Sequence, residues 1–160
     1  EGSSVSVYIC KKNNFLSNLK KLRHYDEILI EKFIPGREIQ VAILGNEKLG
    51  VIELKPKRMF YDYEAKYNPK AKTEHIIPVN ISKKNYDKVT SMALKAHKLL
   101  KCRGVTRSDF RLNGNKFYLL ETNTQPGMTA LSLVPEIAKY RNISFAQLIN
   151  KILLDASINK

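Results

Sequence analysis

Apolar and polar residues recur along the chain with the periods of both strands and helices. Residues 4–10, "SVSVYIC", alternate as a strand does, and residues 27–34, "EILIEKFI", form the apolar run of a buried strand. The segments 37–44 and 49–55 are also strand-like, and the turn residues Gly45-Asn46 between them predict a hairpin.

Helical periodicity marks other parts of the chain. The sequence predicts helices at 14–23, 82–101, 134–140 and 144–155. In the last of these, Ser144 is followed three residues later by Gln147, the signature of a capping box. His97 is the lone histidine of the long helix, and we interpret it as structural or solvated. Strands and helices mixed with hairpins indicate an α+β fold.

Residues 56–80 have a different character, because they are polar and aromatic without a sustained period. A long irregular segment in a compact domain is usually a functional loop or a disordered one. Its aromatic side chains argue against plain disorder, and they are Phe60, Tyr61, Tyr63 and Tyr67. We therefore expect a functional loop.

A second hairpin is predicted at 107–123, where polar residues interrupt a strand-like pattern. Its inward positions are expected to be Phe110, Leu112, Leu119 and Leu120. Because strand side chains alternate, Arg107, Asp109 and Arg111 share a face, as do Glu121 and Asn123.

The two polar sets meet on one face only if the connecting loop has an odd number of residues or a bulge shifts the register. A two-residue turn at Asn113-Gly114 would instead put Asp109 and Glu121 on opposite faces.

If the polar groups converge, their oxygen atoms suit Mg²⁺ or Mn²⁺, and Mg²⁺ typically takes one or two carboxylates plus substrate phosphates. Arg107 would then stabilise charge that develops on a phosphoryl group or a tetrahedral centre. The alternative is a surface hairpin with a solvated ion pair. The sequence contains no P-loop, GxGxxG or HExxH motif.

Composition bounds the class of protein. With 160 residues and 43% hydrophobic residues, the chain is long enough for one domain with a real core. No run approaches the roughly 20 apolar residues of a membrane span, and no signal peptide is visible. The distant Cys10 and Cys102 are expected to be reduced thiols of a cytoplasmic protein. The absence of an initial Met suggests a fragment.

The net charge of +13 raises nucleic acid as a partner. However, 21 of the 28 basic residues are Lys, and no Arg-rich run or aromatic-basic motif accompanies them. We therefore expect no nucleic-acid partner, since a basic pocket for an anionic nucleotide is compatible with the same charge.

Several short stretches carry a resemblance that extends over nearly all of the chain. They are "EGSS", "EKFIPGRE", "FYDYEAKY", "TEH", "RSDF", "LLETNTQPGMT" and "LSLVP". In this order and spacing they resemble the D-alanine–D-alanine ligases of the ATP-grasp superfamily. The resemblance implies that residues 1–34 end the central ATP-grasp subdomain. Residues 35–160 would form the C-terminal subdomain, with a mobile lid at 58–75.

The resemblance also implies a reaction. ATP phosphorylates the carboxylate of one D-alanine, the amine of a second D-alanine attacks the acyl phosphate, and phosphate leaves. The product is a dipeptide precursor of peptidoglycan, made in the cytoplasm. Two Mg²⁺ ions, which Mn²⁺ is able to replace, screen the phosphates.

By the same resemblance, Asp109, Glu121 and Asn123 are metal ligands, and Glu121 bridges both ions. Arg107 and the backbone of Gly127 are expected to stabilise the tetrahedral intermediate.

The nucleotide contacts are implied by "EKFIPGRE". Glu31 would bind the adenine amine, and Lys32 to Ile34 would supply backbone contacts. Phe33 would pack on the ring in a dry slot at a strand end, and Glu38 would accept the ribose hydroxyls.

The lid is implied by "FYDYEAKY". Lys66 would reach the γ-phosphate, while Tyr67 would help to place the second D-alanine and hydrogen-bond with Ser3. A closed lid protects an acyl phosphate from water. Ser132 and Leu133 would contact the carboxylate of the second D-alanine.

The chain departs from the pattern at Ser6, where a Gly is usual, and at Leu131, where a polar residue is common. It also starts after the family's N-terminal domain, which holds the first D-alanine. We therefore expect a fragment that is inactive without that missing part. The full-length enzyme is expected to be a homodimer.

Two alternatives remain open. A related ligase would use D-lactate as the second substrate, although Tyr67 in an intact loop counts against it. A basic nucleic-acid-binding module is supported only by the net charge, and salt-dependent DNA binding that ATP does not compete with would favour it.

Overall fold

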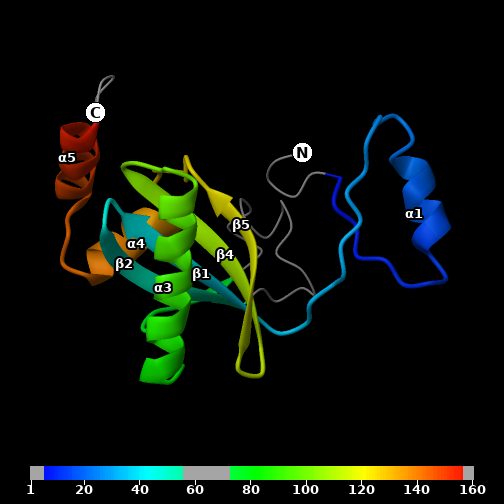
Figure 1. Cartoon of the computed structure of the whole chain (residues 1–160), viewed down its shortest axis with the longest axis horizontal. Coiled ribbons are helices and arrows are strands. Elements are labelled where there is room, and N and C mark those ends of the chain that lie inside the picture. The colour runs from blue at the N-terminus through cyan, green and yellow to red at the C-terminus, as the bar shows by residue number, and fades with distance from the viewer. Residues whose placement is uncertain (1–5, 56–72, 157–160) are drawn as a thin grey trace. The chain divides into compact units, whose positions relative to one another are not determined.

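The computed structural model of the chain describes residues 6–55 and 73–156 (Figure 1). The described residues form two compact units, one holding residues 6–34 and Thr73 and the other residues 35–55 and 74–156. No helix among them is long and apolar enough to cross a membrane. The two units are described separately below.

The first unit contains α1 (Phe15–Lys21), which confirms the helix predicted at 14–23. The predicted strand at 27–34 is wrong, and so is the described part of the strand at 4–10, because neither segment forms a strand. Strands need a neighbour for their backbone hydrogen bonds, and none pairs with these segments in the described chain. Leu29 and Ile30 are accordingly 82% and 65% exposed.

The second unit is built on an antiparallel sheet with the strand order β3-β2-β1-β4-β5. Its strands are β1 (Arg37–Leu44), β2 (Glu47–Lys55), β3 (Glu74–Ile76), β4 (Val105–Asn113) and β5 (Lys116–Asn123). Both predicted hairpins are confirmed. In the first, Leu44 pairs with Glu47 around Gly45, whose positive φ of 57° suits a tight turn.

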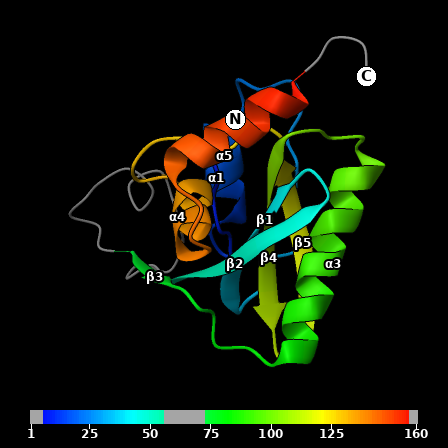
Figure 2. The same ribbon diagram turned by 90° about the vertical axis from the view of Figure 1, so that its left-hand side faces the viewer.

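Helices cover both faces of this sheet (Figure 2). α3 (Lys83–Leu99) packs on one face, and α4 (Leu133–Tyr140) packs on the other, with α5 (Phe145–Asp155) against α4. These helices confirm the predictions at 82–101, 134–140 and 144–155. The α3 face holds the main apolar cluster, which includes Ile39, Val41, Ile43, Val51, Val89, Ala93, Phe110, Leu112 and Phe117.

The caps and contacts of the C-terminal helices follow from single residues. The capping box is confirmed, since Gln147 N donates to Ser144 Oγ and Ser144 N donates to Gln147 Oε1. α4 approaches β2 closely because Gly50 has no side chain, and a Cβ there would lie 2.6 Å from Ile137 Cγ2. The α4 face of the sheet is therefore packed at β2 and carries the polar residues described below on β1, β4 and β5.

Of the four residues predicted to face inward in the second hairpin, two are buried and two are exposed. Phe110 and Leu112 are buried in the α3-face cluster, but Leu119 and Leu120 are 43% and 52% exposed. β5 lies at one edge of the sheet, and its buried apolar side chain is Phe117.

Of the two interpretations of His97, structural or solvated, the structural one is confirmed. It is 3% exposed, and its Nδ1 lies 2.9 Å from Thr106 Oγ1 on β4. Burial lowers the pKa of His97, and Asp155 offsets part of that effect. A charged imidazole is costly to keep away from water, so the folded state holds this ring neutral.

We predict that acid destabilises the fold through His97. The pKa of His97 in the folded state lies below the unfolded value of about 6.5. The neutral ring therefore makes its full contribution to the free energy of unfolding above that value, and this contribution is lost as pH falls towards the folded pKa. Each pKa unit between the unfolded and folded states corresponds to about 1.4 kcal/mol of the free energy of unfolding. Urea unfolding between pH 7.5 and 5 checks this, and His97→Asn should flatten the slope. His24→Asn, in which the replaced histidine is exposed, is the control, and an unchanged slope in His97→Asn would refute the prediction.

Candidate functional site

A β-bulge brings the predicted site residues of the second hairpin onto one face. Asn113 pairs with Lys116, so the turn has two residues, and alternation alone would separate Asp109 from Glu121. The register shifts between Asp109 and Phe110, because Leu120 is an extra residue in β5. Asp109 therefore lies directly opposite Glu121, which confirms the bulge as the route to a shared face.

Arg107 joins the two carboxylates. Its Nε donates to Asp109 Oδ1 at 2.8 Å and its Nη2 to Oδ2 at 3.0 Å, while Nη2 also lies 3.9 Å from Glu121 Oε1. The side chains of Arg107 and Asp109 are only 15% and 11% exposed, whereas that of Glu121 is 63% exposed. The Arg107–Asp109 pair is thus not the solvated surface pair of the alternative interpretation.

The polar face continues onto β1. Glu38 is the register partner of Arg111, and Gln40 is the partner of Asp109. Arg111 Nη2 lies 3.5 Å from Glu38 Oε2, and Arg111 Nη1 donates to the carbonyl of Gly36 at 3.1 Å. We call this set the polar row, and its members are Glu38, Gln40, Arg107, Asp109, Arg111 and Glu121.

Sequence reasoning missed two features of the polar row. It did not pair Arg111 with Glu38, and it did not single out Gln40. A signal was present for Gln40, because it is a polar residue inside the apolar stretch "IQVAIL". The structure shows why it matters, since Gln40 is 1% exposed and stands beside Asp109.

The polar row differs in charge from the rest of the chain. It contains the carboxylates of Glu38, Asp109 and Glu121 and the guanidiniums of Arg107 and Arg111, which leaves one net negative charge in a chain of net charge +13. No three Asp, Glu, His or Cys side chains gather as a metal site in the described part of the chain. The predicted set is two carboxylates and an amide, and oxygen donors of this kind fit Mg²⁺ completed by waters and phosphates.

Asn123 lies next to the polar row, at the end of β5. It is the register partner of Arg107, and its Oδ1 accepts a hydrogen bond of 2.9 Å from Gln125 N. Asn123 therefore lies on the same face as the two predicted carboxylate ligands and holds the start of the following loop.

The loop after β5 brings two other predicted site residues together. A Cβ on Gly127 would lie 2.9 Å from Ser132 Oγ, so the backbone of the loop at Gly127 comes close to the Ser132 side chain. Ser132 is at the N-cap of α4, but its side chain does not cap the helix, and its Oγ instead accepts from Thr129 N at 2.9 Å. Leu133 begins the helix and is 6% exposed. An uncapped helix N-terminus favours a carboxylate.

The predicted adenine contacts lie in the first unit, and they are not on a strand end. Glu31, Lys32 and Phe33 are exposed and Ile34 is partly buried, in a segment without regular structure. The expectation that these residues lie at a strand end is therefore wrong, for the reason given above, and their contacts with the adenine stay a prediction. Ser3, Lys66, Tyr67 and most of the predicted lid lie outside the described residues.

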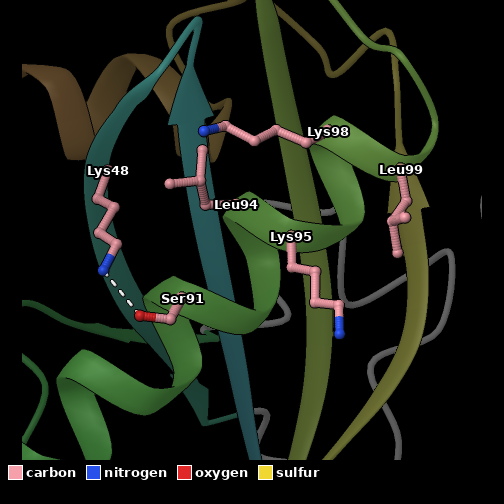
Figure 3. A pocket seen from close by; sticks show the side chains of 6 residues that line it. All are labelled: Lys48, Ser91, Leu94, Lys95, Lys98 and Leu99. Carbon is pink, nitrogen blue, oxygen red and sulfur yellow. Dashed lines mark hydrogen bonds between the residues drawn. The ribbon is translucent and has the colours of Figure 1, made fainter.

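A hollow on the surface of the second unit lies away from the polar row. It has a volume of about 370 Å³ between β2 and α3 and is lined by Lys48, Ser91, Leu94, Lys95, Lys98 and Leu99 (Figure 3). Lys48 Nζ donates to Ser91 Oγ across it at 2.8 Å. It belongs to the α3 side of the sheet, so it adds nothing to the polar row.

Comparison with known proteins gives a consistent result. The sequence profile of the family described as "D-ala D-ala ligase C-terminus" matches residues 1–154. The D-alanine–D-alanine ligase of Pelagibacter ubique (strain HTCC1062) is 68% identical over 160 residues, which cover 100% of this chain and 53% of that protein. The ligase of Paramagnetospirillum magneticum is 43% identical over 98% of this chain and 53% of its own length.

Solved structures agree with the sequence matches. The crystal structure of D-alanine–D-alanine ligase from Bacillus anthracis complexed with ATP has a TM-score of 0.77 and 27% identity, over 91% of this chain and 46% of that one. A second structure of that ligase gives a TM-score of 0.77 and 31% identity, over 91% and 48%. The chain spans about half the length of the relatives it matches. It belongs to the D-alanine–D-alanine ligase family, and its fold is the C-terminal part of the ATP-grasp fold.

Proposed function

We propose that the protein containing this chain joins two D-alanine molecules at the expense of ATP. The observation that carries the proposal is the bulge at Leu120, which sets Asp109 against Glu121 with Arg107 between them. Such an arrangement would allow divalent cations and a phosphoryl group to bind close to a guanidinium. The family and the ATP-bound relative support the same reaction class.

Asp109, Glu121 and Asn123 would hold Mg²⁺, and Mn²⁺ suits the same oxygen donors. When bound, these ions screen the phosphate charges and polarise the transferred phosphoryl group. The nucleotide would be oriented by Glu38, which is itself held by Arg111, and by Glu31 to Ile34.

Arg107 and the backbone of Gly127 would stabilise the negative charge that develops when the second amine attacks the acyl phosphate. Ser132 and Leu133 would bind the carboxylate of that second D-alanine at the start of α4. The close approach of Gly127 to Ser132 supports this division of roles, because the tetrahedral intermediate and the carboxylate of the second D-alanine would then lie next to each other. Lys66, Tyr67 and Ser3 would complete the closed site.

The test is D-alanine-dependent phosphate release from Mg²⁺-ATP by the full-length gene product and by this chain alone. We expect release by the full-length protein and none by the chain. Replacing D-alanine as the second substrate with D-lactate is expected to reduce release at least tenfold. Equal rates with D-lactate would favour the depsipeptide-forming alternative, and no release in any assay would overturn the proposal.

A further inference from the structure

Gln40 has no role in the proposed reaction, yet its position is unusual. It lies in the middle of β1 on the polar face and is 1% exposed. Its Oε1 is buried and has no hydrogen-bond partner among the residues that the structure describes. Buried carbonyl oxygens in native proteins are almost always paired, so one without a partner calls for a specific explanation.

The neighbours of Gln40 do not satisfy its oxygen. On one side its register partner is Ile52, which is apolar, and on the other it is Asp109, which offers only acceptors when ionised. The two nearest guanidiniums along β4 bond elsewhere: Arg107 to Asp109, and Arg111 to Gly36 and Glu38. The described neighbours of Gln40 therefore leave its oxygen without a donor, and a group bound at the site would supply one.

A cation-bound water is the donor that suits this place. Mg²⁺ and Mn²⁺ keep several waters when carboxylates hold them, and such waters donate strong hydrogen bonds. A cation held by Asp109 would place its waters next to the strand position of Gln40. Residues that hold a metal's waters or ligands commonly change metal affinity 10- to 100-fold when they are replaced.

We propose that Gln40 is a positioning residue of the metal site, and that its Oε1 accepts a hydrogen bond from a water on the cation held by Asp109. This inference rests on the proposed metal-binding role of Asp109, Glu121 and Asn123. It also explains why a polar side chain occupies a strand position that an apolar one would fill more stably.

The experiment measures Mn²⁺ affinity by electron paramagnetic resonance on the full-length ligase, with a non-hydrolysable ATP analogue at saturating concentration. Gln40→Met, which keeps the side-chain length and removes the acceptor, is expected to weaken Mn²⁺ binding about tenfold. Without metal the same variant is expected to melt at an equal or higher temperature, because the unpaired oxygen is gone. Gln40→Glu keeps an acceptor oxygen and is expected to retain the affinity.

A matched control is Thr90→Val. Thr90 is also 1% exposed and polar, but it bonds to Tyr86 O within α3 on the opposite face of the sheet. This variant should leave Mn²⁺ affinity unchanged, so a loss in Gln40→Met alone is not a general effect of replacing a buried polar group.

The possible outcomes distinguish a failure of the role inferred for Gln40 from a failure of the proposed metal site. Wild-type Mn²⁺ binding that Asp109→Asn abolishes and Gln40→Met leaves intact would overturn the inference and keep the proposed metal site. A loss of affinity in Gln40→Glu as large as in Gln40→Met would overturn the acceptor role. If the wild-type protein bound no Mn²⁺, the metal site and the inference would both fail.

Discussion

Glu121→Gln is expected to lower kcat of the full-length ligase by roughly 100-fold or more while leaving the fold intact. A carboxylate that holds a metal ion on the transferred phosphoryl group contributes several kcal/mol in the transition state, and a loss of about 3 kcal/mol corresponds to about 100-fold. The side chain of Glu121 is 63% exposed, and its nearest cation, Arg107, lies 3.9 Å away. Its contribution to folding stability is therefore small.

The control is Glu47→Gln in β2. The side chain of Glu47 is 65% exposed and pairs with Lys151 at 3.3 Å, so it matches Glu121 in exposure and in ion pairing. Both variants should melt within a few degrees of the wild type, and only Glu121→Gln should lose activity. Wild-type kcat in Glu121→Gln would remove Glu121 from the metal site and with it the main support for the proposed function.

Local signals in the sequence were sufficient for the elements that depend on local chemistry. The helix from Ser144 formed with its capping box because both hydrogen bonds lie within four residues. The Gly45-Asn46 hairpin formed because its turn requires a positive φ, which glycine supplies.

Strand predictions failed where they depended on a distant partner. The run 27–34 is as apolar as β1, yet only β1 has neighbours on both sides. Apolar content therefore favours a strand without deciding that one forms.

The geometry of the candidate site also depends on strand pairing that the sequence does not specify. Alternation placed Arg107 with Asp109, but it left open whether Glu121 joins them, because one extra residue decides the face. Leu120 is that extra residue. It is an exposed leucine, and nothing in the sequence around it indicates a bulge. The pairing of Glu38 with Arg111 is likewise set by the register of β1 on β4, which the sequence does not specify.

At Gly36, just before the first residue pair of that register, the backbone comes very close to the end of β4. Gly36 lies just before β1 with a φ of 124°, and a Cβ there would clash with the carbonyl oxygen of Leu112. The obstacle is backbone, so no side-chain rotation relieves it. Its own carbonyl accepts from Arg111, the partner of Glu38.

Gly36→Ala is therefore expected to destabilise the protein by about 3 kcal/mol or more, since it combines a disfavoured φ with a steric clash. Gly45→Ala is the matched control, because Gly45 also has a positive φ but has open space around it. That variant should cost only about 1 kcal/mol of backbone strain. Urea unfolding of both variants measures the difference. Similar losses would mean that the β1–β4 contact at Leu112 yields easily, and that Gly36 does not fix the register that pairs Glu38 with Arg111.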